Sequence, residues 1–187
     1  QNTYAGIQVQ GRGHIVRRNQ VMSTGGTTVF GVAGYAQGIL ADGPSVRVID
    51  HDIVTATSAG GNIAFGISMY CDDGMAINNR ISAVDVGILM EYGVKYRDNL
   101  TMDVLFAYDA RIFDGIDIGN SSGNAIVTGN FFYQNYGGGL DGYQGAGGNL
   151  IQNNTFIQNG LGSTGVPSTG GVQGNGASEP QAIRIYG

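Results

Sequence analysis

The chain has 187 residues, enough to bury a core within one domain, and 34 of them are glycine whereas only three are proline. The glycines do not recur at every third position, which excludes collagen, and the Val, Ile and Phe content excludes a disordered chain. The formal net charge of -5 argues against nucleic acid or an anionic membrane as the main partner. No apolar run reaches the length that a membrane-spanning helix needs.

A Gly-Ile pair recurs along the chain. Its glycines are Gly6, Gly38, Gly66, Gly87, Gly115 and Gly139 (the last followed by Leu140), and Ala182-Ile183 is aligned as a seventh copy. Successive glycines are 32, 28, 21, 28 and 24 residues apart. Each spacing suits one turn of a solenoid, because repeats of this length are the signature of stacked supersecondary units.

A second column follows each pair at a nearly fixed distance. It reads Asn19, His51, Asn79, Asp98, Asn130 and Asn154, and the residues two positions later are Val21, Ile53, Ile81, Leu100, Phe132 and Phe156. Apolar and polar residues alternate with a period of two around both columns, which predicts short β-strands. No long segment has the 3.6-residue period of an amphipathic helix.

Together, the Gly-Ile-x-apolar and Asn-x-apolar columns resemble those of the right-handed parallel β-helix family, which includes pectate and alginate lyases, alginate epimerases, polygalacturonases and phage tailspikes. The resemblance covers nearly the whole chain and implies an all-β fold, a right-handed parallel β-helix of about seven coils. It implies core positions for Val9, Met69, Met90 and Ile118, an inward amide ladder for the Asn column, and a secreted or cell-surface protein. It specifies no reaction, because one fold hosts unrelated functions.

We expect residues 1–187 to form a single β-helix domain. The first coil starts at residue 6 and the last stops within a coil, whereas solenoids need polar caps over their open ends. The chain is therefore expected to be a fragment of a longer protein, or to have its ends covered by partner chains. Residues 160–180, rich in Gly, Ser and Pro, are expected to form a loop excursion.

Charged residues beside the Asn column fall on neighbouring coils with opposite signs. The alignment pairs Arg18 with Asp50 and Asp52 with Arg80. We interpret them as exposed ion pairs that keep the lateral surface soluble. His51 is interpreted as a substitute for asparagine in the ladder, since two histidines on different columns do not indicate a zinc site.

The Gly-Ile strand carries two outward columns. The first reads Gln8, Leu40, Ser68, Leu89, Asp117, Asp141 and Arg184, and the second reads Gln10, Asp42, Tyr70, Glu91, Gly119, Tyr143 and Tyr186. Two carboxylates one strand apart, about 4.8 Å, would raise the pKa of one of them or hold a cation such as Ca²⁺. The structural alternative is a surface ion pair in which Arg184 neutralises Asp141.

This patch suits sugar acids, because tyrosine rings stack on sugars, arginine binds carboxylates and Asp or Tyr can transfer a proton. The predicted function is a polysaccharide-interacting β-helix, either a lyase or C5-epimerase of uronate polymers or a non-catalytic, tailspike-like or adhesin-like solenoid. An acidic polysaccharide is the expected partner, and Ca²⁺ held by Asp117 and Asp141 is the expected cofactor of the catalytic alternative.

In the catalytic alternative, Arg184 neutralises the substrate carboxylate and Tyr143 or Asp141 serves as acid or base. Asp117 then orients the substrate or binds Ca²⁺. The substrate-binding surface continues over Tyr70, Glu91 and Tyr186. Hydrolysis by the aspartate pair is a further alternative, since retaining glycosidases hold their two carboxyl groups about 5 Å apart.

Overall fold

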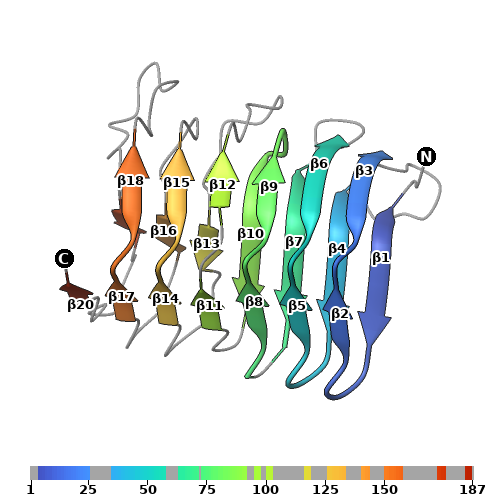
Figure 1. Cartoon of the computed structure of the whole chain (residues 1–187), viewed down its shortest axis with the longest axis horizontal. Helices are drawn as coiled ribbons and strands as arrows, with labels where there is room; N and C mark the ends of the chain where they lie inside the picture. The colour runs from blue at the N-terminus through green and yellow to red at the C-terminus, as the bar shows by residue number, and fades with distance from the viewer. Residues whose placement is uncertain are drawn as a thin grey trace.

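The computed structural model describes residues 4–25, 35–57, 63–71, 73–91, 95–97, 100–102, 116–118, 126–133, 140–143, 150–157, 172–175 and 184–186. All regular structure in these ranges is β-strand, and neighbouring strands pair in parallel. The strand order in each sheet advances by three, so every turn of the chain adds one strand to each of three sheets (Figure 1). The predicted all-β parallel solenoid is confirmed.

We name the three sheets A, B and C. Sheet A contains β1 (Ala5–Gln10), β4 (Ala36–Asp42), β7 (Ala64–Tyr70), β10 (Val86–Glu91), β13 (Ile116–Ile118), β16 (Leu140–Tyr143) and β19 (Val172–Asn175). Sheet B contains β2 (Ile15–Arg17), β5 (Arg47–Ile49), β8 (Met75–Ile77), β11 (Lys95–Arg97), β14 (Ile126–Thr128), β17 (Leu150–Gln152) and β20 (Arg184–Tyr186). Sheet C contains β3 (Gln20–Gly25), β6 (Asp52–Thr57), β9 (Arg80–Ser82), β12 (Leu100–Met102), β15 (Phe131–Tyr133) and β18 (Thr155–Ile157).

Alternate residues of the three sheets fill one continuous core. The isoleucines of the Gly-Ile column stack in register and are fully buried at Ile39, Ile67 and Ile88. Sheets B and C contribute Val48, Ala76, Val127, Ile151, Ile53, Ile81 and Phe132. The predicted third column also holds in register through Val9, Met69, Met90 and Ile118, with Met69 fully buried.

The glycine of the Gly-Ile pair lies where sheet A approaches sheet C most closely. A Cβ atom built on Gly38 would lie 2.5 Å from the carbonyl oxygen of Gly66 and 2.7 Å from Cγ2 of Ile53. Gly66 meets the same obstacle, because its Cβ would lie 2.5 Å from Cγ2 of Ile81, and Gly6 repeats the contact one coil earlier. The glycine column and the apolar column after the asparagines are therefore two sides of one close contact.

The Asn column forms hydrogen bonds between successive coils at the corner that joins sheets B and C. Asn79 Oδ1 accepts from the backbone N–H of His51 at 3.1 Å, and Asn79 Nδ2 donates to the carbonyl oxygen of Val48 at 3.0 Å. Asn154 makes the equivalent two bonds to its preceding coil, each 2.9 Å long. Each side chain thus ties one coil to the coil before it, as the predicted ladder requires.

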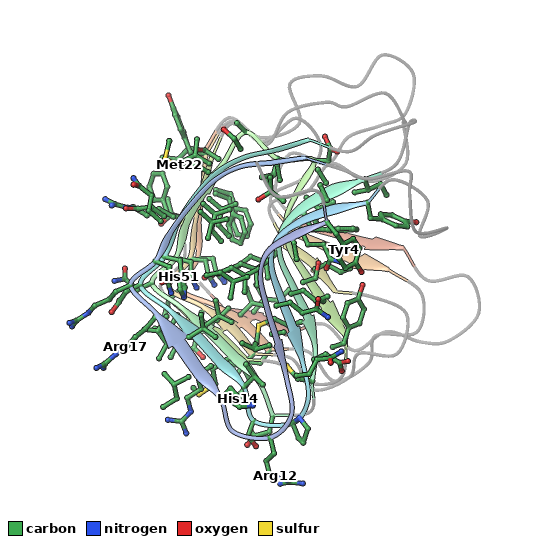
Figure 2. All side chains as sticks on the ribbon, turned by 90° about the vertical axis from the view of Figure 1, so that its right-hand side faces the viewer. Tyr4, Arg12, His14, Arg17, Met22 and His51 are labelled. Atoms are coloured by element: carbon green, nitrogen blue, oxygen red, sulfur yellow. The ribbon has the colours of Figure 1, made fainter. Side chains whose placement is uncertain are left out.

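His51 replaces an asparagine without breaking this ladder. Its Nδ1 accepts a hydrogen bond from the backbone N–H of Asn19 at 3.2 Å, and its Nε2 lies 3.0 Å from the carbonyl oxygen of Val16. Because Nδ1 must accept, the proton of the neutral ring is assigned to Nε2, which donates to Val16. The residue is only 1% exposed, and Figure 2 shows the ring at the inside of the corner. The imidazole therefore supplies the same acceptor and donor as an amide.

The residue before each ladder position turns the chain from sheet B into sheet C. Arg18, Asp50 and Asn78 adopt the left-handed conformation, with φ of 57°, 60° and 53°. Asp50 pairs with Arg18 at 3.6 Å and accepts a hydrogen bond from Asn78 at 2.8 Å. On the next row, Arg80 Nε lies 2.6 Å from Asp52 Oδ1, and this hydrogen bond lowers the pKa of Asp52. Both predicted ion pairs are confirmed.

The strand register corrects the second column in its fourth coil. Leu100 pairs with Arg80, and Thr101 pairs with the buried Ile81. Thr101, not Leu100, therefore continues the apolar column. Asp98, the predicted ladder position of this coil, lies outside the described residues. The prediction failed because coils of different length do not keep a constant distance between the two columns.

The seventh copy of the Gly-Ile pair is also corrected. Val172 of β19 pairs in register with β16, so Gly171-Val172 and not Ala182-Ile183 continues the column. This strand lies inside residues 160–180, which were expected to be a loop; the other residues of that segment lie outside the described ranges. A glycine-rich stretch can form a strand here because the preceding coil offers a complete row of backbone hydrogen-bonding groups.

Adding a methyl group at Gly38 is expected to push sheets A and C apart. Gly38→Ala should lower the free energy of unfolding by about 1 to 3 kcal/mol, the usual cost of overpacking a core. Gly13→Ala is the control, because no heavy atom lies within 4 Å of its Cβ position and only its φ of +72° opposes the change. Urea unfolding of both variants checks this, and equal losses would contradict the close-contact explanation.

His51→Asn is expected to preserve the ladder, because the amide provides the same acceptor and donor. Its stability should stay within about 1 kcal/mol of the parent, whereas His51→Leu should lose about 1 to 3 kcal/mol, chiefly by leaving the buried carbonyl group of Val16 unpaired. Thermal unfolding at neutral pH measures both variants. Equal losses would show that the volume of the ring, and not its hydrogen bonds, is what matters.

Candidate functional site

Sheet A brings most of the predicted site positions into two adjacent rows. The first row runs in register through Gln8, Leu40, Ser68, Leu89, Asp117, Asp141 and Gln173. The second row holds Gln10, Asp42, Tyr70 and Glu91 and, farther along, Tyr143 beside Asn175. Asp117 and Asp141 thus occupy neighbouring positions, as expected, although their side chains, like those of Glu91 and Tyr143, lie outside the described residues.

Arg184 and Tyr186 do not belong to these rows, and their predicted place on the patch was wrong. Both lie on β20 of sheet B, where Arg184 pairs with Leu150 and Tyr186 with Gln152. The position after Asp141 is taken by Gln173 of β19. Sequence reasoning missed Gln173 because its segment has the composition of a loop. The recurrence of a glycine followed by an apolar residue at Gly171-Val172 was the signal that could have revealed it.

The outer face of sheet A is not open along its whole length. Strand alternation assigns Leu40 and Ser68 to the outer face, yet they are only 6% and 0% exposed. Gln8 of the same row and Asp42 of the neighbouring row are exposed. The hydroxyl oxygen of Ser68 and the amide oxygen of Gln37 are buried without a hydrogen-bond partner. Part of β4 and β7 is therefore covered within the folded chain, which confines any ligand on this face to other strands.

The register separates the charged strand residues by sheet. The strands of sheet A carry Asp42, Glu91, Asp117 and Asp141 and no Lys or Arg. The strands of sheet B carry Arg17, Arg47, Lys95, Arg97 and Arg184 and no Asp or Glu. Sheet C carries the ion pair of Asp52 and Arg80. Sequence reasoning missed the cations of sheet B because only strand pairing brings these distant residues onto one surface.

Asp85 is a buried carboxyl group away from both outer rows. Its Oδ2 accepts a hydrogen bond from the backbone N–H of Ala64 at 2.7 Å, and its own N–H donates to the carbonyl oxygen of Ala64 at 2.9 Å. The residue is 4% exposed. Burial raises the pKa of Asp85 to about 6, although the hydrogen bond from Ala64 lowers it in part. These contacts tie the turn before β10 to the start of β7, which is a structural role.

Metal ligands do not gather in the described part of the chain. No group of three His, Cys, Asp or Glu side chains there could hold a metal ion. The Ca²⁺ prediction at Asp117 and Asp141 concerns side chains beyond these residues and stays a prediction. None of the described segments forms a helix long and apolar enough to cross a membrane.

The raised pKa of Asp85 predicts a pH dependence of stability. A folded pKa of about 6, above the ordinary aspartate pKa of 3.8, means that the folded chain binds this proton more tightly. The contribution of Asp85 is therefore fully present below about pH 4 and is lost as the pH rises through about 6, by at most about 3 kcal/mol. Asp85→Asn should remove this loss, whereas Asp42→Asn at an exposed position should not. Urea unfolding from pH 4 to 7 tests it, and parallel pH profiles for the parent and Asp85→Asn would contradict it.

Comparisons with known proteins found no match to this chain among protein-family models, curated proteins or solved structures. The fold assignment therefore depends on the strand register described above. The residue columns resemble the parallel β-helix class, and no individual member is identified.

Proposed function

We propose that this chain is a polysaccharide-binding β-solenoid and that the outer rows of sheet A over β13, β16 and β19 contact the sugar. The observation that carries the proposal is the pairing of Asp117 with Asp141 on neighbouring strands, with Tyr143 two residues farther along β16. Carboxylates accept hydrogen bonds from sugar hydroxyl groups, and a tyrosine ring stacks on the apolar face of a sugar. The row crosses the strands and so follows the solenoid axis, which suits an extended polymer.

This row holds Gln173 at the position where Arg184 was predicted, and the difference changes the expected ligand. A uronate residue brought to sheet A would meet four strand carboxylates and no strand cation. The amide groups of Gln173 and Asn175 instead add hydrogen-bond donors and acceptors that match neutral hydroxyl groups. A neutral, hydroxyl-rich polysaccharide is therefore the favoured ligand of this face.

The lyase or epimerase alternative has lost its strongest support. Abstraction of a proton next to a carboxylate requires that carboxylate to be neutralised, and Arg184 lies on another sheet. Asp117 and Asp141 offer the oxygen ligands that Ca²⁺ takes, so this ion is the remaining route to neutralisation. Glycoside hydrolysis is the second candidate, because one strand spacing of about 4.8 Å approaches the separation of about 5 Å in retaining enzymes.

Replacement of both aspartates is expected to weaken sugar binding. Asp117→Asn/Asp141→Asn should lose about tenfold or more in affinity, since each charge-assisted hydrogen bond contributes about 1.5 kcal/mol or more. Isothermal titration with neutral and uronate polysaccharides, with and without Ca²⁺, measures the loss. Asp52→Asn on sheet C is the matched control. Unchanged binding of every glycan by the double variant would rule out sheet A as the site.

Activity assays on the same proteins separate binding from catalysis. New reducing ends would indicate hydrolysis, ultraviolet absorbance of an unsaturated product would indicate a lyase, and altered NMR signals of alginate would indicate an epimerase. We expect binding without turnover. Any of these products, formed by the parent chain and lost in the double variant, would replace the binding proposal by a catalytic one.

A further inference from the structure

The outer face of sheet B combines cationic and apolar residues in two rows. One row runs in register through Ile15, Arg47, Met75, Lys95, Ile126, Leu150 and Arg184, and the other runs through Arg17, Ile49, Ile77, Arg97, Thr128, Gln152 and Tyr186. Five of the nine Lys and Arg residues of the chain hold these positions, and none of its 14 carboxylates does. A chain with a net charge of -5 thus carries one cationic face.

The described cations of this face are available to a ligand. Arg17 and Arg47 are exposed and form no ion pair with another described residue, whereas Arg18 and Arg80 are paired with aspartates. Figure 2 shows Arg17 pointing away from the ribbon, with Arg12 also directed outward at the turn between sheets A and B. The first 41 residues contain no Asp or Glu. The first coil therefore supplies no carboxylate to this end of the face.

Apolar side chains lie between the cations on the same surface. Ile15 is 60% exposed, and Ile49, Met75 and Ile77 are half-buried on the outer side of β5 and β8. Outward isoleucine and methionine side chains are unusual on a solvent-facing sheet, where polar residues normally alternate with the core residues. Combined apolar and cationic contacts suit a polymer that has both ring faces and negative groups.

The width of the face selects among polyanions. Each described strand of sheet B is three residues long, about 10 Å at 3.3 Å per residue. A single polymer chain fits this width. A membrane or a nucleic acid duplex is wider and would extend past sheet B over sheet A, whose strands carry four carboxylates and no cation.

We propose that the outer face of sheet B binds a linear acidic polysaccharide laid along the solenoid axis. Its carboxylate or sulfate groups are held by the exposed Arg17 and Arg47, and its sugar rings pack on the apolar residues beside them. The strand register places Lys95, Arg97 and Arg184 farther along the same two rows. This site is separate from the proposed neutral-glycan face of sheet A and does not rest on it.

The test uses Arg17→Gln/Arg47→Gln, two exposed positions whose replacement leaves the core untouched. Alginate and polygalacturonate are the acidic probes, dextran is the neutral probe, and affinity is measured by isothermal titration at low and moderate salt. Binding of the acidic probes is expected to weaken as salt rises and to lose about tenfold in affinity in the double variant, whereas dextran binding should be the same in the parent and the double variant. Arg80→Gln, which removes a paired cation of sheet C, should bind like the parent.

Two further proteins make the outcome unambiguous. Met75→Asp places a negative charge in the middle of the face and should weaken acidic polysaccharide binding even if the arginine variant fails to fold. Asp117→Asn/Asp141→Asn should retain that binding, which separates this site from sheet A. Unchanged alginate binding by the sheet B variants, or alginate binding by the parent that does not weaken as salt rises, would overturn the proposal. Tighter binding of anionic vesicles or duplex DNA than of alginate would overturn the assigned ligand class.

Discussion

The hydrogen-bonded register between successive coils is the constraint on which this structure depends. In a parallel solenoid, a slip of one residue would turn a buried row toward solvent and an outer row into the core. The ladder at the corner of sheets B and C opposes such a slip, because the side chains of His51, Asn79 and Asn154 each bond both an N–H and a carbonyl oxygen of the preceding coil. His51 performs this task as Asn79 does, which shows that the ladder selects hydrogen-bonding geometry rather than residue type.

A fixed register has a direct consequence for the surface. Once core rows are aligned, outer residues from distant parts of the sequence form rows of their own, spaced by about one strand, 4.8 Å. Sheet A collects carboxylates and sheet B collects cations, while the charged strand residues of sheet C form an ion pair. Electrostatic character therefore belongs to each face and not to the whole chain, and the net charge of -5 describes none of the three.

The sequence predicted the features that repeat locally. The Gly-Ile and Asn columns, the neighbouring positions of Asp117 and Asp141 and the two ion pairs all follow from periodicity, since each involves a short offset from a recognisable motif. The errors arose where that offset changed. The coil after Gly87 shifts Leu100 out of its column, and the strand at Val172–Asn175 is concealed by loop-like composition, so Arg184 was counted into the wrong sheet.

Sequence by itself determined the class of fold, because a period of two within strands and a longer period between glycines can be satisfied only by stacked coils. It also determined why glycine recurs, although the physical cause, contact with Ile53 and Ile81 across the core, is visible only in three dimensions. Tertiary structure alone decided that the strand cations gather on sheet B and that Arg184 leaves the row of Asp117 and Asp141. That outcome depends on the lengths of the turns between strands, which carry no periodic signal and set the register of every strand that follows.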